Sequence, residues 1–423
     1  IQRLPPGCYL NIDINSGESK LQRWYMPSPN WTVAKKIGDD RNNWLSATKS
    51  AIETAVARQL VSDVPVGAFC SGGVDSSLVS AIAKRKDKNI VLFNVSCPDH
   101  PEVDEGPWAE KVARFLDTDL KTHRLTKESF KSALVKTVWY TEYPLAFLNT
   151  VPLYNLSALA RDAGVKVLLS GEGADECFGG YVSQFKELAI RRVIQSKGPA
   201  LKTALEFALK FSKRYAATVG FSTSSVPSSI GLHQIFAGGL NKWAELSTQI
   251  ENTYGDVSDD WSREMAGELL RQMQTYMLPI LHRTDRASMG ASVEARVPFL
   301  DIDLVELALA MPPKFKVGVK GLKPSGKEIL KEIACDFLPR DIIYRPKMGF
   351  SVPGEYYLDA WPSSWIKDGF VRSFFGLNEA ALRYWLGRER GQSYAWLLTL
   401  EIWGQLFIQN RNVETVNSEY MAG

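Results

Sequence analysis

The sequence is poor in the residues that build disulfide frameworks and metal sites. It has five cysteines in 423 residues, widely spaced and without a Cys-x-x-Cys pair: Cys8, Cys70, Cys97, Cys177 and Cys335. An odd number cannot pair completely, so a full disulfide framework is excluded and a reduced, cytoplasmic protein is the expectation. Four histidines without ligand-like spacing argue against a structural zinc site: His100, His123, His233 and His282.

Long hydrophobic runs and an excess of one charge are also missing. The most apolar stretch, residues 143–160, is interrupted by Pro144, Asn149, Pro152 and Asn155, so no segment reaches the ~18 residues of a membrane helix. Fifty Lys and Arg face 47 Asp and Glu, which gives no electrostatic argument for a nucleic-acid partner. Hydrophobic residues make up 45% and charged residues 23%, values that exclude a disordered chain, a coiled coil and a collagen-like repeat.

The chain instead alternates two kinds of apolar pattern. Its length predicts two or three domains. Short apolar runs at residues 66–70, 90–96 and 165–170 are typical of strands buried on both faces of a parallel sheet. Helical spacing fills the segments around them, at residues 43–60, 76–84, 108–116, 128–139 and 152–163. This alternation predicts an α/β fold with a doubly wound parallel sheet. After Tyr181 strand signals fade, and a mostly helical C-terminal half is expected.

A serine- and glycine-rich loop lies between the first of these strands and the helix that follows. It reads Ser71-Gly72-Gly73-Val74-Asp75-Ser76-Ser77. Unpaired N–H groups at a helix start favour phosphate, and glycines let an anion approach the backbone closely. Asp75 would repel phosphate unless a cation lay between them, so Mg²⁺ is expected there. A plain turn with Asp75 as the helix N-cap is the alternative.

A second loop, rich in glycine and acid, follows the third of these strands. It reads Ser170-Gly171-Glu172-Gly173-Ala174-Asp175-Glu176. In a parallel sheet both loops would lie at the carboxyl ends of strands, where ligands bind. Asp175 is then the predicted second Mg²⁺ ligand, and Glu172 could orient or deprotonate an incoming amine. An acidic, solvated turn is the alternative.

Two further segments carry cations. Lys327 lies on a predicted helix, residues 326–334, and Lys347 lies in Arg-Pro-Lys-Met-Gly-Phe, residues 345–350. Release of pyrophosphate would need such cations, although a lone lysine is usually a surface group. In residues 283–301 arginines and acids alternate within an apolar stretch. That pattern favours partly buried ion pairs in a scaffold rather than catalytic residues.

These motifs resemble those of a known family. The 71–77 loop is similar to the SGGxDSS pyrophosphate loop of ATP pyrophosphatases. The second loop, extended to SGEGADECFGGY, together with residues 283–301 and 327–350, resembles the synthetase domain of glutamine-dependent asparagine synthetases. The motifs keep the same order over roughly residues 43–353. The resemblance implies an ATP-pyrophosphatase (adenine nucleotide α-hydrolase-like) fold and an ATP-dependent carbon–nitrogen ligase.

The resemblance also implies roles for individual residues. ATP phosphates would be bound by Ser71, Gly72, Gly73, Asp75, Ser76 and Ser77, and adenine would be held at Val95 and Ser96. Asp75 and Asp175 would hold Mg²⁺. Gly171 and Glu172 would lie at the acyl-adenylate, with Glu172 as the general base for ammonia. Lys327 and Lys347 would stabilise pyrophosphate, and Asp104 with Glu105 matches an acidic pair of the family.

The implied reaction has two steps. A substrate carboxylate attacks the α-phosphate of ATP and releases pyrophosphate; ammonia then attacks the acyl carbon and expels AMP. Aspartate is the first candidate substrate. Residues 142–154, however, lack the Arg and paired Thr associated with aspartate recognition, so amidation of a hexuronic acid of surface polysaccharides and β-lactam-type ring closure are alternatives. A nucleic-acid-modifying role is disfavoured by the balanced charge.

Whole members of the family begin with a glutaminase domain whose nucleophile is an N-terminal cysteine. This chain begins with Ile1, and its residues 1–28 resemble the last strands of that domain. The expected division is therefore a remnant at 1–28, a linker at 29–42, the synthetase domain at 43–410 and a tail at 411–423. Such a chain would use free ammonia, with the glutaminase acting in cis or in trans, and a homodimer is implied. Neither a nucleic acid nor a membrane is an expected partner. Residues 222–229 and the tail are predicted to be disordered.

Overall fold

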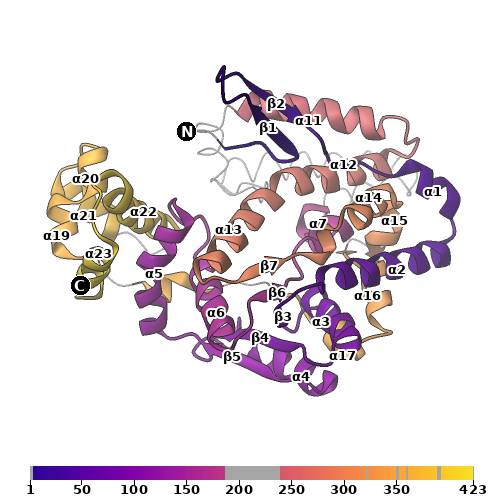
Figure 1. Cartoon of the computed structure of the whole chain (residues 1–423), viewed down its shortest axis with the longest axis horizontal. Helices are drawn as coiled ribbons and strands as arrows, with labels where there is room; N and C mark the ends of the chain where they lie inside the picture. The colour runs from indigo at the N-terminus through magenta and orange to yellow at the C-terminus, as the bar shows by residue number, and fades with distance from the viewer. Residues whose placement is uncertain are drawn as a thin grey trace, which may run out of the picture. The chain divides into compact units, whose positions relative to one another are not determined.

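The computed structural model describes residues 3–185, 239–320, 323–348, 352–358, 361–387 and 392–422. The polar stretch at 222–229 lies outside these residues. Contacts divide the chain into two compact units. We call them the sheet unit, residues 52–172, 278–298 and 331–423, and the helical unit, residues 1–51, 173–277 and 299–330. Figure 1 labels their helices and strands.

The sheet unit contains five parallel strands in the order β5-β4-β3-β6-β7. Their bounds are β3 Val66–Phe69, β4 Val91–Ser96, β5 Leu120–Arg124, β6 Val167–Leu169 and β7 Glu294–Arg296. From β3 the chain adds β4 and β5 on one side, then returns to add β6 and β7 on the other. The predicted doubly wound α/β sheet is confirmed. The change of direction between β3 and β6 marks the edge where ligands bind in such sheets.

Helices cover both faces of this sheet. They are α3 Val74–Lys86, α4 Gly106–Leu116, α5 Lys127–Thr141 and α6 Thr150–Asp162. A further helix, α13 Met277–Gly290, precedes β7 in the chain. Both α4 and α6 contact β4 and β5, and Figure 1 shows them on opposite sides of these strands. Apolar side chains such as Phe93, Leu134 and Leu168 form the core between the layers. The predicted helices of this region are thus present, with shifts of a few residues at their ends.

The C-terminal part of the chain is helical. Its elements are α16 Glu328–Ala334, α17 Arg340–Ile343, α18 Gly354–Tyr357, α19 Ser363–Asp368, α20 Phe370–Phe374, α21 Glu379–Gly387, α22 Gln392–Trp403, the π-helix η3 Gly404–Ile408 and α23 Val413–Ala422. The prediction of a disordered tail is wrong, because α23 buries Val416 and Tyr420 and the Tyr420 ring stacks on Trp365. Apolar residues spaced four apart supply one buried face, which is enough to fix a short helix.

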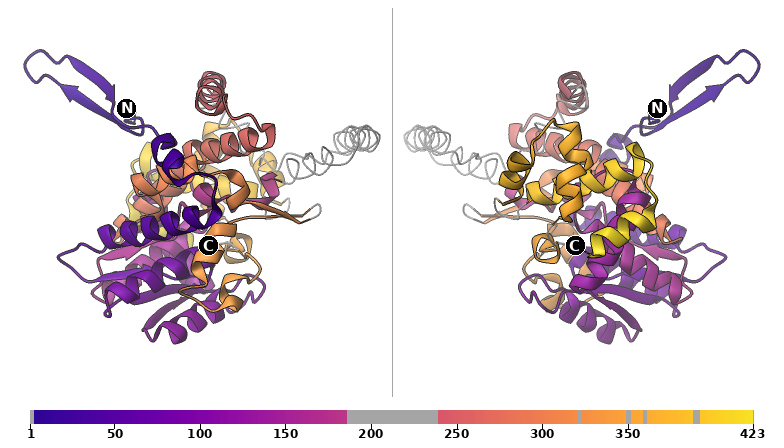
Figure 2. Two further views of the ribbon diagram at one scale, coloured as in Figure 1. Left: turned by 90° about the vertical axis from the view of Figure 1, so that its right-hand side faces the viewer. Right: turned by 90° about the vertical axis from the view of Figure 1, so that its left-hand side faces the viewer.

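The helical unit opens with an antiparallel hairpin, β1 Cys8–Ile12 and β2 Ser19–Arg23, which Figure 2 shows in side view. Its other elements are α1 Trp31–Ile37, α2 Arg41–Gln59, α7 Ala174–Phe178, η1 Val182–Phe185, α11 Gly239–Tyr254, α12 Asp260–Thr275, η2 Pro298–Leu300, α14 Ile302–Ala310, α15 Pro313–Lys316, β8 Gly318–Lys320 and β9 Lys323–Ser325. α2 continues from this unit into the sheet unit. A smaller core joins Phe185, Trp261 and Met265.

The segment predicted to be a linker is partly helical. The predicted linker at 29–42 contains α1, which Asn30 caps by accepting a hydrogen bond from Val33 N (3.1 Å). The division into remnant, linker, synthetase domain and tail stays a prediction, since compact units are not the same as domains.

All five cysteines are free thiols, as expected. Of the described helices, none is long and apolar enough to cross a membrane.

Candidate active site

The loop predicted to bind phosphate forms the turn between β3 and α3. α3 follows the cap residue Gly73, and Ser77 N donates the first helical hydrogen bond to Gly73 O (3.0 Å). Across the loop, Ser71 Oγ lies 3.1 Å from Ser76 Oγ, and Ser71 N donates to the same oxygen at 3.1 Å. N–H groups in the first turn of a helix lack intrahelical acceptors. The loop therefore presents N–H donors and the positive end of the α3 dipole to an anion.

Asp75 lies in the first turn of α3, whose cap is Gly73. The alternative in which Asp75 caps the helix is therefore wrong. Among the described residues, no group of three or more His, Cys, Asp and Glu side chains could hold a metal ion. Mg²⁺ in nucleotide sites usually takes one or two carboxylates and completes its shell with phosphate oxygens and water. A single carboxylate beside an anion-binding loop fits that kind of site.

The two glycines of the loop have different reasons to be there. Gly72 has φ +69°, and an added Cβ would lie 2.4 Å from Trp108 Cβ and 2.8 Å from Ala109 N. Gly73 has φ −78°, and its added Cβ would only approach the side chains of Ser71 (3.3 Å) and Arg345 (3.4 Å). The fold requires glycine at position 72. At position 73 the close approach of a ligand explains it better.

A buried arginine from a distant segment binds the loop carbonyls. Arg345 Nε donates to Gly72 O (2.8 Å), and Nη2 donates to Ser71 O (3.3 Å) and Glu105 Oε1 (2.6 Å). The side chains of Arg345 and Glu105 are only 4% and 8% exposed. Burial raises the pKa of Glu105 to about 7, and Asp75 acts in the same direction, whereas Arg345 lowers it. Arg345 thus holds the loop through its carbonyl oxygens.

The residues predicted to hold adenine end strand β4. The Val95 side chain belongs to the hydrophobic core, and Ser96 Oγ donates to Asp104 Oδ2 (3.1 Å). Asp104 Oδ1 also accepts from Cys97 N (3.0 Å) and Gly106 N (2.9 Å). Both predicted side chains are thus committed to the fold. A contact with adenine at Val95 and Ser96 would have to come from their backbone.

The second loop meets the first at Gly171. An added Cβ there would lie 2.6 Å from Ser76 N and 2.9 Å from Asp75 C. Only glycine allows so close a contact, because any side chain would displace the start of α3. Since β3 and β6 are hydrogen-bonded neighbours, the two loops lie side by side at the carboxyl edge of the sheet.

Glu172, next along this loop, is held by two consecutive residues of α13. Its Oε1 accepts from Arg283 Nη2 (2.6 Å) and Thr284 Oγ1 (2.8 Å). Arg283 Nη1 also donates to Asn149 Oδ1 (3.1 Å), the residue before α6. The Glu172 and Arg283 side chains are 20% and 12% exposed. Sequence reasoning assigned no role at this carboxylate to Arg283, Thr284 or Asn149.

The rest of the 283–301 stretch behaves differently. Arg286 pairs with Glu142 Oε2 at 3.0 Å, with both side chains substantially exposed. Arg296 Nη1 donates to Gln59 O and Val61 O, both at 2.8 Å, and so ties the end of α2 to β7. The scaffold interpretation describes Arg296 well. It misses Arg283, whose partner is the predicted catalytic carboxylate.

In the helical unit, Asp175 and Lys327 form an ion pair. Lys327 Nζ lies 2.7 Å from Asp175 Oδ1, and Lys327 is 4% exposed. Lys327 stands before α16 rather than on it, with φ +59°. The surface-lysine alternative is therefore wrong for Lys327. Two residues predicted for separate roles, metal binding and pyrophosphate stabilisation, bind each other here.

Two side chains remain to be described, Glu176 of the second loop and the predicted cation Lys347. Tyr181 OH donates to Glu176 Oε1 (2.7 Å), and Glu176 is 1% exposed. Burial, and then the neighbouring Asp175, raise the pKa of Glu176 to about 7. The alternative of an acidic, solvated turn is therefore wrong for Glu176. Lys347, in the sheet unit, is exposed, and its predicted role stays a prediction.

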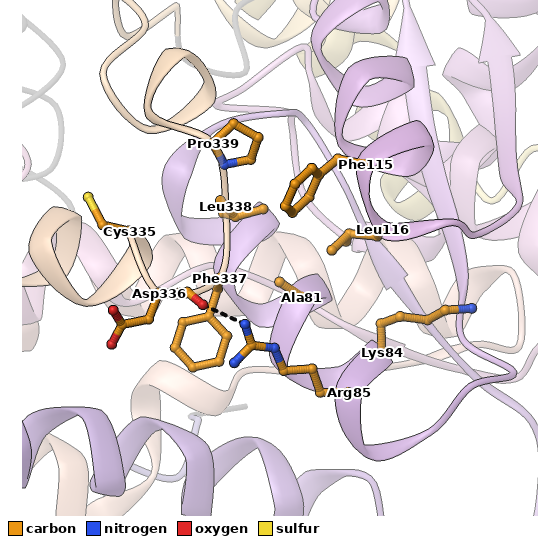
Figure 3. Close-up of a pocket in the computed structure, with 10 residues that line it drawn as sticks. All are labelled: Ala81, Lys84, Arg85, Phe115, Leu116, Cys335, Asp336, Phe337, Leu338 and Pro339. Carbon is orange, nitrogen blue, oxygen red and sulfur yellow. Dashed lines mark hydrogen bonds between the residues drawn. The ribbon is translucent and has the colours of Figure 1, made fainter.

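A surface pocket of about 370 Å³ in the sheet unit lies apart from these residues. Its lining comes from the far end of α3, the end of α4 and the segment after α16: Ala81, Lys84, Arg85, Phe115, Leu116, Cys335, Asp336, Phe337, Leu338 and Pro339. Figure 3 shows the Arg85 guanidinium beside the Phe337 ring, 4.0 Å from its centre. None of the lining residues belongs to the two loops, so this pocket is not the candidate active site.

Comparison with known proteins identifies the family. The family model described as asparagine synthase matches residues 47–405. The chain belongs to the asparagine synthase family. Members of this family are ATP-dependent ligases that form amides, so the predicted class of enzyme is confirmed at the level of the family.

Three relatives of this family member extend the comparison. A Mycobacterium tuberculosis protein provisionally named glutamine-hydrolyzing asparagine synthetase is 28% identical over 384 residues, which cover 85% of this chain and 56% of that protein. Glutamine-hydrolyzing asparagine synthetase 1 of Bacillus subtilis is 28% identical over 344 residues, 79% of this chain and 54% of that protein. Amidase chry2 of Gibberella zeae is 26% identical over 406 residues, 86% of this chain and 59% of that protein. The chain spans about half the length of the relatives that it matches.

Proposed function

We propose that this asparagine synthase family member catalyses ATP-dependent amide synthesis at the 71–77 loop. A substrate carboxylate attacks the α-phosphate of ATP, and pyrophosphate leaves as the acyl-adenylate forms. Adenylation is needed because a carboxylate is a poor electrophile, whereas AMP is a good leaving group. Ammonia then attacks the acyl carbon, and the C–O bond to AMP breaks.

The observation that carries the proposal is the pair of loops at the edge where β3 and β6 end. The first offers N–H groups at the start of α3, two facing serine hydroxyls and the bare backbone of Gly73. These are the features of a phosphate site at a helix N-terminus. The second brings Gly171 against Ser76, so Glu172 follows directly beside the site for the activated carboxylate.

Magnesium fits the chemistry of this site. Bound at Asp75, it would neutralise charge on the phosphate oxygens during displacement. Asp175 as a second ligand remains a prediction, since its carboxylate pairs with Lys327. Residues of the chain itself contribute the N–H donors of the loop and the hydroxyls of Ser71 and Ser76, all of which bind and orient the phosphates.

Aspartate is the first candidate acceptor, because relatives are named asparagine synthetase. A hexuronic acid is the second candidate. Arg283, the cation beside Glu172, is already bound by Glu172 and Asn149, and aspartate carries a second carboxylate that would need a cation of its own. An acceptor with one carboxylate makes no such demand. Lactam formation, with an internal amine in place of ammonia, remains the third alternative.

Other features of the whole protein belong to the same proposal. A glutaminase domain, in cis or in trans, would supply ammonia from glutamine, as the names of two relatives indicate. A homodimer is the expected assembly, with gel filtration and light scattering as its direct test.

The test is a panel of carboxylates with ATP, Mg²⁺ and ammonium chloride, followed by pyrophosphate release and amide formation. We expect one acceptor to support both, and aspartate failing where glucuronate or galacturonate succeeds would reverse the order of candidates. Asp75→Ala should abolish ATP–pyrophosphate exchange, and the exposed carboxylate variant Asp63→Ala should retain it. Full exchange in Asp75→Ala with an intact fold would refute the phosphate and Mg²⁺ assignment.

A further inference from the structure

The two oxygens of the Glu172 carboxylate have different surroundings. Oε1 accepts two hydrogen bonds, from Arg283 Nη2 at 2.6 Å and from Thr284 Oγ1 at 2.8 Å. Oε2 is buried and accepts none from any residue that the structure describes. A buried acceptor without a donor destabilises the fold, and more so when it is charged. A native fold tolerates such an atom where a ligand supplies the donor.

Arg283 is itself fixed by three groups. Nη2 binds Glu172 and Nη1 binds Asn149 Oδ1 at 3.1 Å, and the guanidinium carbon lies 6.0 Å from the centre of the Phe147 ring. Arginine and carboxylate commonly form two parallel hydrogen bonds. Here they form one, and Arg283 Nε donates to no described residue. The pairing therefore fixes one oxygen of Glu172 and leaves the other unused.

Both donors to Oε1 come from adjacent positions of one helix. Arg283 and Thr284 are consecutive residues of α13, and Thr284 is 3% exposed. Because both donors stand on one helix and bind the same oxygen, they fix the direction in which the carboxylate points. Losing either donor would let the carboxylate turn about its last bond, so that the second oxygen would no longer keep one direction.

We infer that Arg283 and Thr284 are positioning residues for amide formation, and that Glu172 Oε2 is the atom that accepts the proton of the incoming amine. The inference rests on the proposed function. As ammonia attacks, the C–N bond forms, the C–O bond to AMP breaks with its electron pair on AMP, and one N–H proton passes to Oε2. The nucleophile is thus a small amine with an N–H directed at Oε2. Adenylation, which precedes this step, needs no proton at Glu172.

The experiment measures the two half-reactions separately, with the acceptor that the carboxylate panel selects as the substrate. ATP–pyrophosphate exchange reports adenylation, and amide formation from ammonium chloride reports the second step. For Arg283→Met we expect exchange within about threefold of wild type and a loss of amide formation of about 100-fold, the lower range of general-base effects. Arg283→Lys keeps the charge and should restore much of the amide formation. Thr284→Val removes one hydrogen bond to the carboxylate and should reduce amide formation about tenfold.

Two further measurements exclude a merely structural role. Arg286→Met removes an arginine of the same helix whose pair with Glu142 is exposed, and it should leave both half-reactions near wild type. Hydroxylamine is a stronger nucleophile than ammonia and depends less on a base, so the deficits of Arg283→Met and Thr284→Val should shrink with it. A structural defect would reduce reaction with both nucleophiles equally.

The outcomes can be told apart. No exchange with any carboxylate in the wild type refutes the proposed function, and the inference with it. Wild-type activity combined with equal loss of exchange and amide formation in the folded variants refutes the inference alone. If Arg283→Met does not fold, Thr284→Val and Arg283→Lys decide: unchanged ratios of amide formation to exchange in both would overturn the positioning role.

Discussion

Replacing Gly72 with alanine perturbs the 71–77 loop, and the neighbouring Gly73→Ala serves as its matched control. At Gly72 the backbone has φ +69°, which costs an L-residue about 1–2 kcal/mol. The new methyl group would lie 2.4 Å from Trp108 Cβ and 2.8 Å from Ala109 N. Such overpacking typically adds about 1–3 kcal/mol. We therefore expect Gly72→Ala to lower the free energy of unfolding by about 2–5 kcal/mol.

Gly73→Ala should behave in the opposite way. Its φ of −78° is ordinary, and the nearest atoms, at 3.3 and 3.4 Å, belong to side chains. Alanine lowers the conformational entropy of the unfolded chain, which stabilises the fold by about 0.4–1 kcal/mol. As a helix cap alanine is poorer than glycine, and this loss cancels a similar amount. Stability should thus change by less than about 1 kcal/mol. Its methyl group does, however, occupy the backbone face proposed for phosphate, so ATP–pyrophosphate exchange should fall at least tenfold.

Urea unfolding followed by circular dichroism compares the two variants with wild type, and exchange assays follow on the folded proteins. Equal stability of Gly72→Ala and Gly73→Ala would refute the packing argument. Undiminished exchange in Gly73→Ala would show that no phosphate approaches that part of the backbone.

Two other substitutions test buried features away from the loops. Burial lowers the pKa of Lys316 to about 7; because the unfolded state binds more protons between pH 7 and 10.5, stability should rise with pH over that range. Lys316→Met should flatten this rise and stabilise the protein at pH 7 by a few kcal/mol. The free energy of unfolding, measured with urea at several pH values, should therefore differ in its pH dependence between the two proteins, and the same dependence in both would contradict the assignment. At Gly404 an added Cβ would lie 1.9 Å from Phe370 Cδ1, so Gly404→Ala should lower the thermal midpoint by several degrees. Adding Phe370→Leu should recover part of that loss, and simple additivity of the two changes would argue against the clash.

The central strands of the sheet can be predicted from the sequence, whereas its two edge strands cannot. β3, β4 and β6 are covered on both faces, so their sequences are short apolar runs that stand out. β5, Leu-Lys-Thr-His-Arg, is an edge strand with a half-exposed pattern, and β7 has three residues at the other edge. Neither contains the apolar run on which the prediction relied. The edges of the sheet were missed for that reason.

The candidate site, too, can be predicted from the sequence only in part. Its two loops were predictable because each is a continuous motif next to a strand. The side chains that hold them were not, since Arg345 binds Gly72 O across 273 residues of sequence and Arg283 binds Glu172 across 111. Arginine in an apolar stretch signals a buried partner, but only the fold determines which carboxylate that partner is.

The interleaving of the two compact units also sets the order in which the site is completed during synthesis. When Glu172 has been made, the 71–77 loop and Gly171 are already present, but Arg283 lies 111 residues further along the chain. At about 5–20 residues per second, that interval lasts roughly 6–22 s. Arg345 follows Gly72 by 273 residues, or roughly 14–55 s at the same speed. The 71–77 loop therefore spends much of translation without the cation that binds its carbonyls, and a chain released early would present it in that state.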